Sequence, residues 1–133
     1  MADKKLSAEK SERLKKELGR KIKECRGDES LRGLARAVGI PPSNMKYIED
    51  GINAPSPEVY RKIIETLKPT PFDRKKMDFL FMELRNMPPP DVSDIIIKNR
   101  ELVDTLRLLE KRELTDEQRE ELNSLLLAFF DKV

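Results

Sequence analysis

Apolar residues recur at helical spacing along the whole chain, and no segment shows the strict alternation of a half-buried strand. Leu14, Leu18, Ile22 and Cys25, for example, form one stripe with steps of three or four positions. Ser or Thr marks several helix starts, and Gly or Pro marks several helix ends. The sequence therefore predicts an all-α protein.

The predicted helices lie between these start and stop signals. The first begins at a cap on Ser7 or Ser11 and ends at Gly27, and the second runs from Ser30 to Gly39. Three more helices are predicted to follow Pro42, Ser56 and Pro71. After the prolines at 88–90 we expect a short helix near 92–96, one from about 100, and a last one that opens with a capping box at 115–118.

Charge and proline content suggest how the chain is divided. Residues 1–70 hold 16 Lys and Arg against 11 Asp and Glu, a net charge of +5, whereas residues 71–133 hold 11 against 14, a net of −3. The run "MPPP" at 87–90 favours a stiff linker. We expect one domain at 1–70, a connecting helix at 71–87, and a small helical domain at 88–133. Only the basic domain is expected to meet a polyanion.

Composition argues against several classes of protein. The chain has no His and one Cys, Cys25, so the usual zinc sites and nucleophile–base pairs are excluded. We therefore expect no enzyme activity, no metal and no cofactor, and we expect Cys25 to be a core residue. No apolar run is long enough to span a membrane, and a single Cys forms no intramolecular disulfide, so we expect a cytoplasmic protein without a membrane partner.

The stretch "LARAVGIPPSNMKYIEDG" at 34–51 predicts two short helices joined by a sharp turn at Gly39, where a positive φ is easily adopted. Met45 and Ile48 of the second helix are predicted to face the interior. The opposite face carries short polar groups, an amide, a cation and a phenol, which suit base edges and phosphates. These residues are Pro42, Ser43, Asn44, Lys46 and Tyr47.

Residues from about 18 to 67 resemble the five-helix DNA-binding domain of the lambda repressor/Cro family, often called Xre-type. The resemblance rests on "LARAVGI", on "YIEDG", on Pro55 four residues after that glycine, and on "SPEVYRKIIETL". It implies that Ser43, Asn44 and Tyr47 face base edges, with Pro42 at the start of their helix.

The same resemblance implies that Lys46, Asn53 and the first turn of the helix after Ser56 lie near phosphates. Arg32 or Arg36 would replace a phosphate-binding Gln, whose usual position is occupied by Leu31. An Arg that ends the first helix often pairs in this family with a Glu that ends the recognition helix. Arg26 and Glu49 occupy those two positions, and a structural ion pair is implied.

The C-terminal half is expected to form a dimer, because its last helix has more apolar surface than a small domain can cover. The residues expected at the dimer contact are Leu122, Leu125, Leu126, Phe129 and Phe130. A homodimer would place two helix-turn-helix motifs on a palindromic operator, as a transcriptional repressor does.

The order of the segments also resembles regulators of stress response or mobile elements that are controlled by a metallopeptidase. One alternative is an antitoxin that binds its own operator and a toxin protein. Another is a protein–protein adaptor with the same fold.

Overall fold

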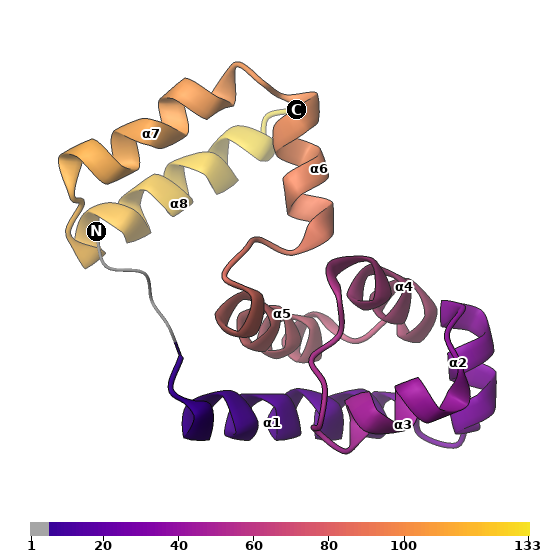
Figure 1. The fold of residues 1–133 in the computed structure, drawn as a ribbon. Helices are drawn as coiled ribbons and strands as arrows, with labels where there is room; N and C mark the ends of the chain where they lie inside the picture. Colours follow the sequence, from indigo (N-terminus) through magenta and orange to yellow (C-terminus); the bar gives the residue numbers. More distant parts are fainter. Residues whose placement is uncertain (1–5) are drawn as a thin grey trace. The chain divides into compact units, whose positions relative to one another are not determined.

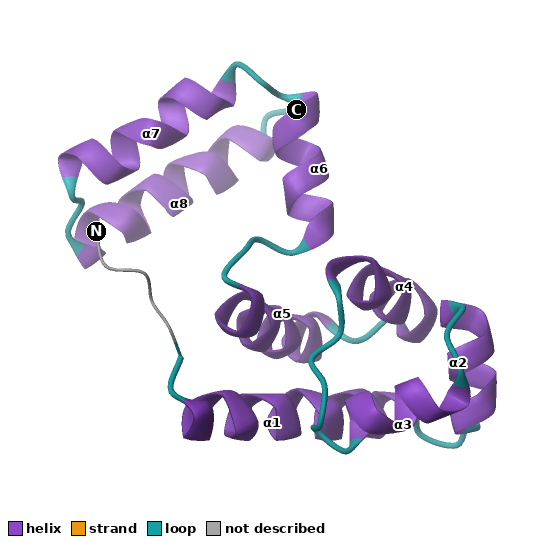
Figure 2. Cartoon of the chain, viewed as in Figure 1, coloured by secondary structure: helices purple, strands orange, loops and turns teal. Residues whose placement is uncertain are grey.

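The computed structural model describes residues 6–133, and within this range it contains eight helices and no strand (Figures 1 and 2). The prediction of an all-α protein is confirmed for these residues, and residues 1–5 of the expected first domain lie outside them. The helices are α1 (Ala8–Arg26), α2 (Leu31–Val38), α3 (Pro42–Glu49), α4 (Pro57–Leu67), α5 (Pro71–Arg85), α6 (Pro90–Lys98), α7 (Leu102–Arg112) and α8 (Asp116–Phe130).

Most helix starts are set by a side-chain cap. The hydroxyl oxygens of Ser7, Ser30, Ser56 and Thr70 each accept a hydrogen bond from the backbone N–H three residues further on. At α8, Thr115 does the same within a complete capping box. Helix α3 differs, because Pro41 precedes it and supplies no side-chain cap.

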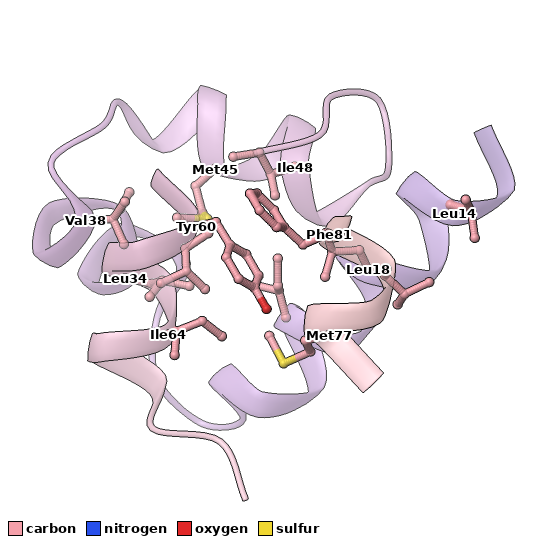
Figure 3. Packing of buried hydrophobic residues seen from close by; sticks show 14 residues of the cluster. Leu14, Leu18, Leu34, Val38, Met45, Ile48, Tyr60, Ile64, Met77 and Phe81 are labelled. Atoms are coloured by element: carbon pink, nitrogen blue, oxygen red, sulfur yellow. The ribbon is translucent and has the colours of Figure 1, made fainter. Parts of the chain in front are cut away.

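The chain divides into two compact units, one that ends at Asp94 and one that covers Ile95–Val133. The core of the first unit is built from α1 to α5 (Figure 3). Its buried apolar residues are Leu14, Leu18, Ile22, Leu34, Ala35, Val38, Met45, Ile48, Tyr60, Ile63, Ile64, Met77, Leu80 and Phe81.

Helix α5, which the sequence suggested as a connector at 71–87, packs closely against α1 and belongs to the first unit. Its residues Met77, Leu80 and Phe81 are at most 2% exposed. The Phe81 ring stacks on the ring of Tyr60, with 4.3 Å between centroids and 14° between planes. The first unit therefore extends well past residue 70, because α5 forms one wall of its core.

The start of α6 also belongs to the first unit. Arg61 donates a hydrogen bond of 2.6 Å to Asp94, and Arg74 lies 3.1 Å from a carboxylate oxygen of Asp91. Arg74 also pairs with Asp78, which accepts a 2.6 Å hydrogen bond from the Tyr60 hydroxyl. These contacts explain why the unit continues beyond the prolines at 88–90.

The second unit contains α7 and α8, which run antiparallel in Figure 1. Neither helix has a buried residue. The apolar side chains of α8 are exposed, and Phe129 meets Phe130 edge to face with 5.6 Å between centroids. This unit therefore lacks an apolar interior of its own.

Within the described part of the chain, no helix combines the length and apolar character that crossing a membrane requires.

Candidate nucleic-acid interface

Helix α3 is held on the first unit by one apolar edge and one ion pair. Met45 and Ile48 are buried in the core. Glu49, the last residue of α3, is also buried, and its carboxylate accepts two hydrogen bonds from Arg26 at the end of α1, of 2.8 and 2.9 Å. A third N–H of Arg26 donates to the backbone oxygen of Glu29. The orientation of α3 is thus fixed at its C-terminal end.

Glycine lets α1 and α3 approach each other closely. A Cβ on Gly19 of α1 would lie 2.3 Å from the backbone oxygen of Ile48 and 2.5 Å from that of Glu49. Directly after α3, Gly51 has φ +76°, and a Cβ there would lie 2.6 Å from Cα of Lys16. The end of α3 therefore rests backbone to backbone on α1, with no side chain between them.

The outer face of α3 carries the side chains that the sequence pattern singled out. Pro42, Ser43, Asn44, Lys46 and Tyr47 are all exposed, and Tyr47 is 46% exposed. Lys46 lies 3.2 Å from Asp50 one turn further on. Among residues 6–133, the side chains of Ser43, Asn44 and Tyr47 form no hydrogen bond. Their donors and acceptors are therefore free to bind a ligand.

The other expected contact residues flank this face. Arg32 and Arg36 are exposed on α2, which packs against α3, and neither forms an ion pair with another described residue. Asn53 is exposed in the segment between α3 and α4. The expected contact residues thus lie on α2, on α3 and in the segment that follows α3, and the first turn of α4, which is also expected near phosphates, comes directly after that segment.

One residue that sequence reasoning missed is Arg85, at the end of α5. Its Nε donates to the backbone oxygen of Pro55 at 3.0 Å, and its Nη2 donates to that of Ala54 at 2.8 Å. These bonds hold the segment that carries Asn53, which passes α5 in Figure 1. No local pattern reveals this role, because the two carbonyls lie 30 and 31 residues earlier.

Cys25 packs against the edge of the core and is half-buried. Its Sγ lies 3.9 Å from a carboxylate oxygen of Asp73, and burial raises the pKa of the thiol. Within residues 6–133, no three Cys, Asp or Glu side chains gather as a metal site requires.

The residues expected at the dimer contact lie on α8 in the second unit. Leu122, Leu125, Leu126, Phe129 and Phe130 are between 36% and 65% exposed. The first four are spaced three, one and three positions apart, so they share one face of the helix. This face is apolar and uncovered in the single chain.

No known protein family, no curated protein and no solved structure matches this chain. Support for a function therefore comes from the residues themselves and from their arrangement in the two units.

Proposed function

We propose that this chain is a sequence-specific DNA-binding transcriptional regulator that acts as a homodimer, with a helix-turn-helix in the first unit and a dimerisation hairpin in the second. The observation that carries the proposal is the outer face of α3. Ser43, Asn44 and Tyr47 are exposed there without internal hydrogen bonds, on a helix whose inner face is locked to α1.

Helix α3 would lie in the major groove, which admits an α-helix and displays a distinct pattern of donors and acceptors for each base pair. Asn44 can pair with adenine through its amide, and Ser43 and Tyr47 can donate to or accept from base edges. The Arg26–Glu49 pair keeps the helix in one orientation, so little conformational entropy is lost on binding.

Cations of α2 and α3 would position the protein on the DNA backbone. Arg32 and Arg36 of α2, and Lys46 of α3, are exposed and suited to phosphate contacts. Asn53 would add a neutral donor from the segment after α3. Such contacts supply affinity and register, whereas sequence preference comes from the base contacts.

The second unit supports a homodimer because α7 and α8 bury no side chain of their own. Helices of 11 and 15 residues are marginal in water without packing. A second copy would cover the apolar face of α8, and each Leu or Phe that becomes fully buried adds about 1.5–3 kcal/mol. A two-fold dimer would present two copies of α3 to half-sites about 34 Å apart, which is the requirement of a palindromic operator.

The same apolar face could instead bind a toxin protein. The second candidate function is therefore that of an antitoxin. The exposure of α8 favours a protein partner without specifying which one. A purified chain that is a dimer supports the regulator. A chain that remains a monomer at micromolar concentration supports the antitoxin.

The proposed function is tested by selecting duplexes from a random pool with the full chain. We expect one preferred palindromic sequence. On that sequence, Asn44→Ala and Tyr47→Ala should each weaken binding by about 1–3 kcal/mol and relax the preference. Glu65→Ala, an exposed substitution on α4, is the matched control and should bind as the wild type does. Failure to enrich any sequence would contradict the proposal.

A further inference from the structure

A groove of about 510 Å³ lies beside α3 in the first unit. Its polar lining comes from four elements: Lys15 of α1, Asn44 of α3, Asn53 and Ser56 of the segment before α4, and Arg85 of α5. Apolar residues of α3, of α4 and of the segments before each of these helices complete it. The groove therefore shares Asn44 with the outer face of α3.

The charges of this groove are unusual for the surface of this protein. Its lining contains two cations, Lys15 and Arg85, and no carboxylate. Within the described residues neither cation forms an ion pair. By contrast, a hollow of about 630 Å³ between α4, α5 and the start of α6 has two carboxylates in its lining, Glu65 and Asp91. Of its cations, Arg61 and Arg74 are paired with aspartates, and Lys68 forms no ion pair with another described residue. Two uncompensated cations at one groove favour an anion.

Arg85 has free donors with which it can bind a ligand in addition to the two backbone carbonyls that it already contacts. A guanidinium has five N–H donors, and the two bonds to the oxygens of Ala54 and Pro55 leave the others free. Those two bonds also hold the side chain in place, so its remaining donors are fixed before any ligand arrives. The Ser56 hydroxyl accepts from the N–H of Val59 and keeps its own proton available as a donor.

We propose that this groove binds one phosphate group of the DNA backbone. Lys15 and Arg85 both form ion pairs with that phosphate, and Asn53 and Ser56 donate hydrogen bonds to its oxygens. This inference rests on the proposed function, because the phosphate belongs to the duplex that α3 reads. A tetrahedral anion with several acceptor oxygens suits a lining of convergent donors without a carboxylate. DNA binding therefore depends on α5, which lies outside the region of family resemblance.

The test measures duplex affinity of the full chain between about 50 and 200 mM salt for Lys15→Ala, Arg85→Gln and the double variant. Arg85→Gln removes the charge but keeps a side-chain amide that can donate to one of the two carbonyls. Arg13→Ala on α1 and Lys76→Ala on α5 are the matched controls, since both remove an exposed cation from the same helices. Melting curves check that each variant is folded.

We expect each single variant to weaken binding to all sequences alike and to leave sequence preference unchanged. The plot of log affinity against log salt has a negative slope, and the double variant should reduce its magnitude by roughly 0.9, the value for one phosphate. Arg85→Lys should retain the wild-type slope, because it keeps the charge. Both controls should retain it as well.

Three results would overturn the inference. One is a double variant with the slope of the controls, and another is a loss of roughly twice that value, which would mean two separate phosphates. The third is saturable binding of inorganic phosphate alone at millimolar concentration, since the groove would then be a site for a free anion. Failure of the proposed function is distinguishable, because the wild-type chain itself would then select no duplex.

Discussion

Arg26 and Glu49 form a two-point ion pair across 23 residues of sequence, with Nε to Oε2 at 2.8 Å and Nη2 to Oε1 at 2.9 Å. The Glu49 side chain is only 4% exposed. The hydrogen bonds to Glu49 raise the pKa of Arg26. The pair joins the end of α1 to the end of α3, so it acts on the one helix whose orientation matters most for the proposed DNA contact.

Glu49→Ala should destabilise the first unit by about 3–5 kcal/mol, because it leaves the Arg26 guanidinium partly buried without its carboxylate. Asp50→Ala is the matched control. It removes the neighbouring carboxylate, which pairs with Lys46 at the surface and should contribute about 1 kcal/mol or less. Chemical denaturation of both variants measures the difference. Equal midpoints for the two variants would show that the Arg26–Glu49 pair contributes no more to stability than the surface pair of Lys46 and Asp50.

Two fragments should differ in whether they fold. A fragment of residues 1–94 contains the whole first unit and should unfold cooperatively, whereas a fragment of residues 1–70 lacks Met77, Leu80 and Phe81 and exposes the ring of Tyr60. Loss of three buried side chains of this size removes on the order of 5–9 kcal/mol, which exceeds or equals the stability of many small domains. Thermal melts by circular dichroism decide the matter. A cooperative melt of the shorter fragment would show that α5 is dispensable for folding.

Stability should fall with increasing pH above 10 because of Tyr60. Burial raises the pKa of its phenol above the ordinary value of 10.0, and the hydrogen bond to Asp78 adds to the shift. Above pH 10 the unfolded chain therefore loses this proton while the folded chain keeps it, and the free energy of unfolding declines by up to about 1.4 kcal/mol per pH unit.

Tyr60→Phe removes that titration and keeps the ring stacked on Phe81. The difference in unfolding free energy between wild type and variant should be constant from pH 7 to about 9 and should shrink above pH 10. Urea denaturation at each pH gives this difference. Parallel curves up to about pH 11 would mean that the phenol ionises as easily in the folded state as in the unfolded state.

The full chain should sediment as a dimer at micromolar concentration. Replacing Leu125 and Phe129 together by Asp should give a monomer, because two carboxylates would be desolvated in the contact. The affinity of this variant for the palindromic duplex should fall as well, because a monomer no longer binds two half-sites together. Glu120→Asp and Glu121→Asp, made together on the same helix, form the control. A wild-type monomer, or a double Asp variant that is still a dimer, would contradict a contact through α8.

Helix starts were predictable because the information is local. Ser7, Ser30, Ser56 and Thr115 each bond to a backbone N–H only three residues away, so four consecutive residues suffice to recognise the start. The same holds for the end of α2, where Gly39 has a left-handed conformation with φ +85°.

The extent of the first unit could not be read in the same way. The run "MDFLFMEL" is apolar on several sides, and only packing shows that Phe81 is fully buried whereas Phe79 is 60% exposed. The prolines at 88–90 indicated a boundary, but Arg61 and Arg74 bind Asp94 and Asp91 on the far side of it. Pairs between such distant residues have no signature in the sequence.

The candidate site shows the same contrast. The inner and outer residues of α3 follow from helical periodicity, since Met45 and Ile48 are buried and the polar residues between them are exposed. The proposed phosphate contacts of Lys15 and Arg85 depend on how α1 and α5 pass the segment before α4. That arrangement arises only when the whole unit is packed.

The stacked and buried position of Tyr60 has a practical consequence for optical experiments. The chain has no Trp and two Tyr, so Tyr60 and Tyr47 are its only strong ultraviolet fluorophores. Tyr60 is fully buried in the core and Tyr47 is exposed on α3. In the Tyr60→Phe chain all tyrosine emission therefore comes from Tyr47 on α3, the helix proposed to contact base edges. Quenching by added duplex would report contact at that helix without any attached label.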